Sequence, residues 1–268
     1  MKAQTRSDVW MPLIQRLTEV APQWAVWKNV DSALTGSGDI DSLAPPSYWP
    51  VIESEFRRWA SSQGLGPAIA CPHIPGGLNL VALERGSGFL FEVGVKERKA
   101  FRGSTLFHWA DLIPFVEMDA RGFRRVRPGA EGVLKLVLNG MRPGGGANWA
   151  DIESKNVVPL LEADPVGASE AAELFGRSAG QIRRAVSAVT AGKWDRRAAL
   201  LIEMRALALA AAHPALAAKR IRFKMAGKHS CPVVSALLGH ARHVPSDVDA
   251  WLLEVEHTHT PHEVGAGL

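Results

Sequence analysis

Two aspartates one residue apart, Asp39 and Asp41, are the side chains of this chain best suited to chemistry. They open a short segment that reads as a β-strand, and side chains at i and i+2 of a strand point to the same face. Two carboxylates this close repel each other unless a cation compensates their charge. Mg²⁺ prefers oxygen ligands of this kind. The pair therefore predicts a magnesium site.

A small-residue loop comes directly before the two acids. Its residues Gly36, Ser37 and Gly38 combine backbone freedom with N–H groups that could approach phosphate oxygens. An acidic pair beside such a loop indicates nucleotide chemistry. We therefore treat these three residues as candidate nucleotide contacts.

A third acid, Glu92, lies in a strand-like run at residues 89–95. It has the opposite parity to Phe89, Phe91 and Val93, so its side chain should face away from theirs. Two interpretations stay open. Glu92 occupies a solvent-facing or edge position, or it converges with the two aspartates as a third carboxylate.

The first hundred residues read as a mixed sheet with helices on one face. Apolar spacing predicts amphipathic helices, alternation predicts strands, and Pro- and Gly-rich segments at 72–77 and 85–88 predict turns between antiparallel strands. Ser7 or Asp8 is the expected N-cap of the first helix. The expected elements are helices at 8–20 and 48–61 and strands at 24–27, from 39 onward, and at 68–71, 78–83 and 89–95.

The rest of the chain reads mostly as helix. The expected helices lie at 105–118, 130–141, 149–163, 169–192, 194–213 and 245–256. A Gly- and Pro-rich segment at 142–147 is the expected linker. The fold class is therefore α+β, with a first domain at 1–145, a helical domain at 146–225 and an extension at 226–268. His residues at 257–262 could mark a metal cluster, but a solvated tail is the favoured interpretation.

The composition of the 268 residues narrows the possible settings of the protein. The sequence shows no apolar run long enough to span a bilayer and no apolar signal segment near its start, so we expect a cytoplasmic protein without a membrane partner. The two cysteines lie far apart, which does not suggest a disulfide framework. The net charge of +4 comes with basic clusters that suit a phosphate-rich partner or form ordinary solvated faces. These clusters lie at 121–127, 183–197 and 219–228.

The ordered motifs resemble a known family. Lys28-Asn-Val-Asp, Gly36-Ser-Gly-Asp-Ile-Asp, a helix, His73-Ile-Pro-Gly-Gly, Phe91-Glu-Val and Arg102-Gly follow one another as in the nucleotidyltransferase-fold domains of the DNA polymerase β superfamily. The resemblance covers roughly residues 20–145 and is greatest to bacterial members. It implies transfer of an NMP from an NTP with two Mg²⁺ ions, which stabilise the attacking and leaving oxygens.

The resemblance also implies roles for individual residues. Asp39, Asp41 and Glu92 would be the catalytic metal ligands, although the family usually has Asp where this chain has Glu92. Ser37 would contact phosphate, and Lys28 would neutralise triphosphate charge. Two basic residues match a later motif loosely and are further candidate triphosphate contacts: Lys135 and Arg142. The Gly-Ser of this chain adjoins the acids directly, whereas many members carry it further upstream.

A segment at 169–186 has helix-turn-helix spacing, with Arg183 and Arg184 placed to touch nucleic acid. A plain helical bundle explains the same spacing. The leading hypothesis is a magnesium-dependent nucleotidyltransferase with an RNA acceptor such as tRNA, or a protein acceptor, possible in a toxin or defence system with a cognate antitoxin. The alternatives are a non-catalytic nucleic-acid-binding protein and a partner-binding pseudoenzyme.

Overall fold

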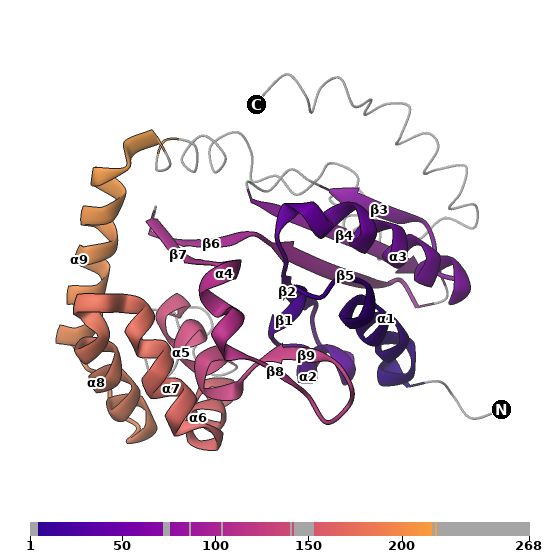
Figure 1. The fold of residues 1–268 in the computed structure, drawn as a ribbon. Helices are drawn as coiled ribbons and strands as arrows, with labels where there is room; N and C mark the ends of the chain where they lie inside the picture. Colours follow the sequence, from indigo (N-terminus) through magenta and orange to yellow (C-terminus); the bar gives the residue numbers. More distant parts are fainter. Residues whose placement is uncertain are drawn as a thin grey trace. The chain divides into compact units, whose positions relative to one another are not determined.

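The computed structural model describes residues 5–71, 76–85, 87–102, 104–139, 141, 153–215 and 218, without the side chains of 153–156 (Figure 1). The chain divides into two compact units. The first holds the described residues of Met1–Trp24 and Asn29–Glu97, and the second holds Ala25–Lys28 and the described residues of Arg98–Ala218. The expected linker at 142–147, the extension at 226–268 and the expected helix at 245–256 lie outside the described residues.

The protein is an α+β structure with a mixed seven-stranded sheet in the order β3-β4-β5-β2-β1-β9-β8, and a separate hairpin of β6 and β7. Strands β3, β4 and β5 are antiparallel to one another, whereas β2 runs parallel to β5. In the second unit, β1 is parallel to β9 and β8 is antiparallel to it. The strands are β1 (Ala25–Lys28), β2 (Ile40–Leu43), β3 (Ala68–Cys71), β4 (Gly77–Glu84), β5 (Phe89–Lys96), β6 (Arg98–Phe101), β7 (Ser104–His108), β8 (Val116–Met118) and β9 (Arg124–Val126).

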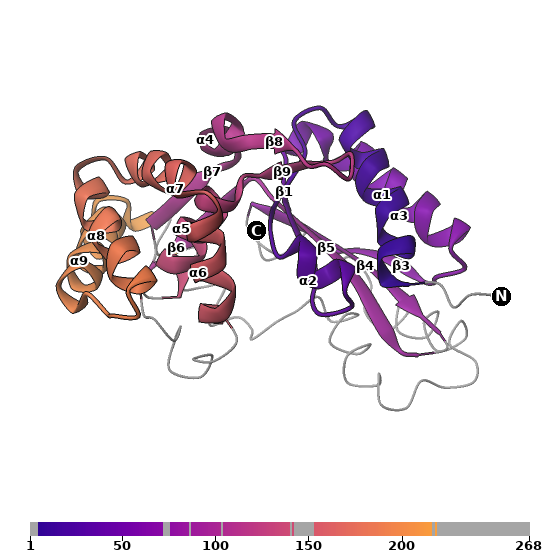
Figure 2. The same cartoon turned by 90° about the horizontal axis from the view of Figure 1, so that it is seen from below.

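Two helices, α1 (Arg6–Val20) and α3 (Trp49–Ser62), lie side by side over one face of the strands of the first unit (Figures 1 and 2). Trp10 of α1 stacks on Trp59 of α3 with ring centroids 5.3 Å apart, and both rings meet the edge or face of Phe91 in β5. The three rings are buried, so they join the helices to this face of the sheet.

The predicted elements of the first unit agree with the structure apart from two local features. The N-cap of α1 is Thr5, not Ser7 or Asp8, because Asp8 occupies the third helical position of a capping box with Thr5. Part of the segment between β1 and β2, read as a loop from the sequence, forms the short helix α2 (Val30–Leu34). The three antiparallel strands lie where the turn signals placed them.

The prediction of one helix over 105–118 is wrong. The segment contains β7, the short helix α4 (Trp109–Leu112), a 3₁₀ turn at Ile113–Phe115 and β8. Pairing of β7 with β6 leaves Phe107 buried, so the apolar spacing is satisfied by a hairpin and a turn rather than by one helix. Pro114 lies in the 3₁₀ turn, where its missing N–H costs little.

The second unit combines these strands with helices. Helix α5 packs against α6 and α7, and α8 packs against α9. Gly176 adopts a positive φ of 51° in a 3₁₀ segment at Glu173–Ser178, which separates α7 from α8 where the sequence suggested one continuous helix. The helices are α5 (Pro128–Leu138), α6 (Glu153–Ala163), α7 (Pro165–Ala172), α8 (Ala179–Thr190) and α9 (Arg196–Ala212). Across the described ranges, we find no helix with the length and apolar character needed to cross a bilayer.

Candidate functional site

The three predicted acids lie on one face of the sheet in the first unit. Asp39 directly precedes β2, Asp41 lies within it, and Glu92 lies in the neighbouring parallel strand β5. Asp41 is opposite Gly94 in the register of these strands, so alternation places Asp41, Gly94 and Glu92 on the same face. The other face carries Phe91, which packs against α1 and α3.

Three polar side-chain groups meet in the space above Gly94, which has no side chain of its own. A Cβ atom at this position would lie 3.5 Å from Oδ1 of Asp41, 3.6 Å from Oδ1 of Asn79 and 3.7 Å from Nζ of Lys96. Asn79 lies opposite Gly94 on β4, and Lys96 follows two residues later on β5. A carboxylate, an amide and an ammonium therefore share one small space over β2, β5 and β4.

Asn79 links this space to Glu92. The amide of Asn79 donates to Oε1 of Glu92 over 3.3 Å, while its Oδ1 accepts a hydrogen bond of 2.9 Å from Nζ of Lys96. The amide is thereby oriented, because only its oxygen can accept from the ammonium and only its nitrogen can donate to the carboxylate. The cation and the third acid are connected through one neutral side chain.

The carboxyl of Glu92 has a raised pKa. Its pKa is raised to about 7, chiefly by burial and then by the negative charge of Asp39, with a smaller rise from Asp41, while the positive charge of Lys96 acts in the opposite direction. The two aspartates are thus close enough to Glu92 to affect its proton. A cation placed among the three carboxylates would favour the ionised form of Glu92.

The donor set is chemically suited to Mg²⁺, since it consists of carboxylate and amide oxygens. Within the described ranges, however, no three or more His, Cys, Asp or Glu side chains meet closely enough to form a metal-binding group by themselves. Mg²⁺ is commonly held by one or two carboxylates, with substrate phosphates and waters as the other ligands. The residues present fit an ion that arrives with a polyphosphate, with Asp39 and Asp41 as its protein ligands.

Two backbone N–H groups of the loop before the acids are already used in hydrogen bonds within the chain. The N–H groups of Gly36 and Ser37 donate to the carbonyls of Ala33 and Ser32, over 3.0 and 2.8 Å, and thereby close the end of α2. The expectation that these two N–H groups are free for phosphate is therefore wrong in this structure. Gly36 and Gly38 have φ values of 92° and 103°, a conformation that favours glycine at both positions.

The predicted basic contacts to the triphosphate belong to other parts of the chain. Lys28 ends β1 in the second unit, with its Nζ 5.3 Å from the ring centroid of Trp27. Lys135 is buried in α5, also in the second unit, and Arg142 lies outside the described residues. Lys28 and Lys135 thus belong to a different unit from Asp41.

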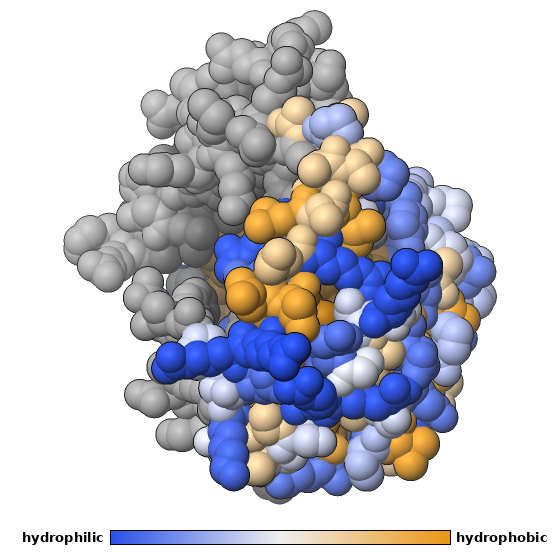
Figure 3. Space-filling view, turned by 90° about the vertical axis from the view of Figure 1, so that its left-hand side faces the viewer, coloured by the Kyte–Doolittle hydropathy of each residue, from blue (hydrophilic) through white to orange (hydrophobic). Residues whose placement is uncertain are grey.

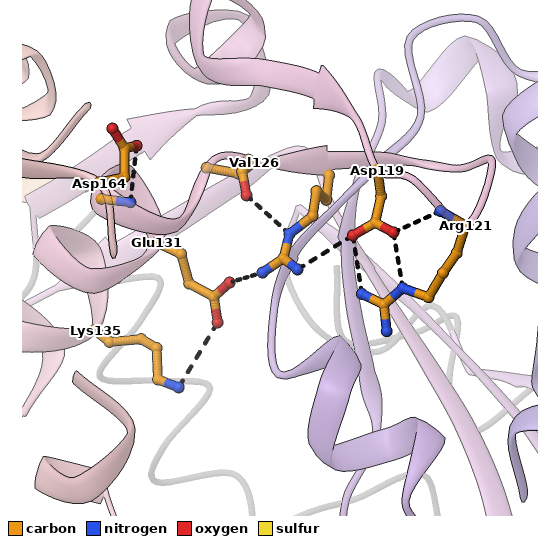
Figure 4. Close-up of polar contacts among 8 residues, drawn as sticks. Asp119, Arg121, Val126, Glu131, Lys135 and Asp164 are labelled. Atoms are coloured by element: carbon orange, nitrogen blue, oxygen red, sulfur yellow. Dashed lines mark hydrogen bonds and ion pairs between the residues drawn. The ribbon is translucent and has the colours of Figure 1, made fainter. Parts of the chain in front are cut away.

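Lys135 takes part in a buried charge network (Figure 4). Its Nζ lies 3.7 Å from Oε1 of Glu131, and the other oxygen of Glu131 accepts from Arg125 over 3.1 Å. Arg125 also reaches Asp119 at 3.4 Å, and Asp119 pairs with Arg121 at 2.7 Å. The hydrogen bonds from Arg121 hold the pKa of Asp119 far below its usual range. Lys135 therefore has a clear structural partner.

The two arginines expected to touch nucleic acid are each engaged in an ion pair. Arg183 pairs with Glu173, and Nη2 of Arg184 lies 3.0 Å from Oδ2 of Asp195. Both arginine side chains are exposed, so these pairs are weak and remain accessible to other partners. Gly176 lies in the 3₁₀ segment between α7 and α8, within the range for which the sequence predicted helix-turn-helix spacing.

Sequence reasoning missed Asn79 and Lys96. Both are polar residues in mainly apolar strands, and a signal was present: Lys96 has the same parity as Glu92 on β5. The strand register that places Asn79 beside Gly94 depends on pairing between strands and is not visible in the local sequence.

Comparison with known proteins does not identify a family for this chain. No family model matches the chain, and neither the curated proteins nor the solved structures show a significant similarity to it. Function must therefore be inferred from the acidic site of the first unit and from the chemistry of its side chains.

Proposed function

We propose that the acidic face of β2 and β5 is the centre of a magnesium-dependent nucleotidyltransferase, which moves an NMP from an NTP to an acceptor. One observation carries the proposal: Asp41, Asn79 and Lys96 converge over Gly94, next to a Glu92 whose pKa is raised by burial and by Asp39. Grouped acids that affect one another's protonation are typical of functional sites.

The two aspartates are the proposed protein ligands of the ion. Asp41 is buried and Asp39 is half-buried, so one carboxylate is fixed in the sheet and the other lies toward solvent. Bound Mg²⁺ would stabilise charge on the oxygens around the phosphorus under attack.

Lys96 is the proposed cationic contact to the phosphates. Its ammonium lies on the same face as Asp41 and is held by Asn79. An ammonium in this position can attract a phosphate oxygen and compensate part of the charge that develops on it. Lys96 is the candidate that the structure supports by contact, because its Nζ and Oδ1 of Asp41 both lie within 4 Å of a Cβ atom built at Gly94.

Glu92 is proposed as the third carboxylate of the site. Its side chain is half-buried and bonded to Asn79, and its pKa of about 7 makes it partly protonated at neutral pH. When a cation and a substrate reduce the repulsion from Asp39 and Asp41, Glu92 can ionise and accept a proton or join the ion's ligands.

RNA such as tRNA is the acceptor we propose first, with a protein acceptor as the other possibility. The net charge of +4 and the pI of about 9.3 favour a phosphate-rich macromolecule. A role as a toxin or defence protein, with an antitoxin as partner, belongs to the same proposal. Growth inhibition on expression that disappears in an Asp39→Asn/Asp41→Asn variant would support this role.

The test is transfer of label from each NTP to total RNA and to protein in the presence of Mg²⁺. We expect labelling by the wild type and loss of labelling in Asp39→Asn/Asp41→Asn. Glu53→Gln is a matched control, because this acid lies on α3 and pairs with Arg57 away from the site. Equal labelling by the wild type and the double variant would contradict the proposal.

Binding measurements on the same variants separate the alternatives. NTP·Mg²⁺ binding that depends on Asp39 and Asp41 without any transfer would indicate a pseudoenzyme. Salt-dependent nucleic-acid binding that survives loss of both aspartates, but fails in Arg183→Ala/Arg184→Ala, would indicate a non-catalytic nucleic-acid-binding protein.

A further inference from the structure

A pocket lies in the second unit between the β6–β7 hairpin, α5, the 3₁₀ segment at Glu173–Ser178 and α9. Its volume is about 420 Å³ with its open mouth included, which suits a small molecule rather than a peptide or a nucleic acid. Figure 3 shows the face of the molecule on which α9 lies, where apolar side chains gather beside strongly hydrophilic ones. The pocket therefore combines access from solvent with an apolar setting.

The lining of the pocket is mainly apolar. Eight of its eleven residues are apolar, and four of these are buried: Phe101, Val137, Ile202 and Ala206. The polar residues of the lining are Ser104, Thr105 and Arg205. Apolar walls with a few polar groups are typical of pockets for small ligands, because the walls bind the body of the ligand and the polar groups fix its orientation.

A β-bulge lies in the hairpin beside the pocket. The pairs around it are Lys99 with Phe107 and Ala100 with Thr105. Leu106 lies between these pairs as the extra residue of β7. A bulge turns side chains away from simple alternation and is common next to functional sites. Here Thr105 and Leu106 both line the pocket although they are adjacent in sequence.

Arg205 is the charged residue of the lining. It is half-buried on α9, and its Nη1 donates to the backbone oxygen of Phe175. Its Nη2 lies close to Gly176, since a Cβ atom at that glycine would be 3.6 Å away. Gly176 also has a positive φ of 51°, which favours glycine. The 3₁₀ segment therefore holds the guanidinium of Arg205 in place at the pocket.

Arg205 has no carboxylate partner within the part of the chain that the structure describes. By contrast, Arg125 and Arg127 of the same unit each pair with a carboxylate. A guanidinium has five N–H donors, and the bond to Phe175 uses one of them. The remaining donors match the two oxygens of a carboxylate. The pocket thus presents a positioned cation beside apolar walls.

We propose that this pocket binds a small carboxylate with an apolar body. The head of the ligand pairs with Arg205, and its body lies against Ile202 and Ala206. A carboxylate is the matching head group, because its single charge equals that of the one cation in the lining. All lining residues belong to the second unit, whereas the proposed transferase site belongs to the first. The proposal therefore does not depend on the transferase.

The first test compares hexanoate with hexan-1-ol, which has the same body without the charge. Calorimetry with the full chain should show that the wild type binds hexanoate about tenfold more tightly than the alcohol. Arg205→Met should bind both equally. Arg177→Met is the control, because this exposed arginine belongs to the same 3₁₀ segment but does not line the pocket. It should keep the wild-type preference. Equal affinities of the wild type for both ligands would overturn the proposal.

The second test fills the pocket and does not change its charge. Ala206→Leu adds three carbon atoms at a buried lining position, so the variant should lose hexanoate binding. Ala208→Leu is the matched control on the same helix, because Ala208 is exposed and does not line the pocket. It should bind hexanoate like the wild type. Binding that survives unchanged in Ala206→Leu would place the ligand elsewhere and contradict the assignment.

The third test varies the ligand. Acetate lacks the apolar body and should bind the wild type at least about tenfold more weakly than hexanoate, since each buried methylene contributes about fourfold. Hexyl phosphate should also bind more weakly than hexanoate. Tighter binding of hexyl phosphate would show a phosphate site and overturn the choice of a carboxylate. A wild type that binds no hexanoate at all, as expected if the remainder of the chain occupies the pocket, would overturn the whole proposal.

Discussion

The Nζ atom of Lys96 lies 2.9 Å from Oδ1 of Asn79, which fixes a cation above the acidic face of the sheet. The same amide bonds Glu92. The ammonium of Lys96 therefore compensates part of the negative charge of the carboxylates before any ion or nucleotide is present. This arrangement leads to predictions that separate the binding of a metal ion from the binding of a nucleotide.

Replacement of Lys96 should change these two affinities in opposite directions. In Lys96→Met, the loss of positive charge near Asp41 should strengthen the binding of Mg²⁺ alone, whereas NTP·Mg²⁺ should bind about tenfold more weakly, which corresponds to about 1.4 kcal/mol. Calorimetry with Mg²⁺ and with NTP·Mg²⁺ measures both. Lys193→Met, an exposed residue of the second unit, is the control. A shift of both affinities in the same direction would contradict a phosphate contact.

Glu92 should make the protein less stable as the pH rises. Its pKa increases from 4.5 in the unfolded chain to about 7 in the folded protein, so the folded state binds the extra proton between these values. Its contribution to stability is therefore full below about pH 4.5 and is lost as the pH rises to about 7, with a total of at most about 3 kcal/mol.

Glu92→Gln tests this pH dependence. Urea unfolding without divalent ions should show that the variant gains stability over the wild type between about pH 5 and about pH 8. A stability difference that is the same at both pH values would show that the carboxyl of Glu92 titrates normally.

Gly129 should not tolerate a side chain. A Cβ atom there would lie 2.0 Å from the backbone oxygen of Asp164 and 2.4 Å from the backbone nitrogen of Ala168. Gly129→Ala should therefore lower the free energy of unfolding by about 3 kcal/mol or more. Gly180→Ala is the matched control, because a Cβ atom there would meet nothing within 4 Å and the helix should gain up to about 1 kcal/mol. Thermal unfolding of both variants measures the contrast.

Glu131 should contribute much more to stability than an exposed acid. It is buried and contacts both Arg125 and Lys135, so Glu131→Gln leaves two buried cations without their shared carboxylate. We expect a loss of about 3 kcal/mol. Glu53→Gln, which breaks the exposed pair with Arg57, should cost less than about 1 kcal/mol. Equal losses in urea unfolding would mean that the buried network is not stabilising.

The local sequence pattern was sufficient to predict much of the secondary structure of the first unit. Turn signals and alternation located β3, β4 and β5, and the parity of β5 placed Glu92 on the face away from Phe91. These features depend on neighbours in sequence. Over 105–118, the same kind of apolar spacing suited a helix equally well, and pairing between β6 and β7 decided the outcome.

The candidate site was also predictable only in part, because some of its contacts depend on pairing between strands. The spacing of Asp39 and Asp41 in the sequence was enough to predict them as site residues. Asn79 belongs to the site because it pairs with Gly94 on the neighbouring strand, which the local sequence does not show. The N–H groups of Gly36 and Ser37 could not be judged from composition, because their use depends on a short helix whose end they close. Contacts made across strands and at helix ends are set by tertiary structure.

Asp164 connects the beginnings of two helices. Its carboxylate accepts from the N–H of Gly129 in α5 and of Gly167 in α7, and it pairs with Arg127. Because one acceptor serves both helix starts, fraying of either start would release a hydrogen bond of the other. The first turns of α5 and α7 should consequently exchange their amide protons with solvent as one cooperative unit.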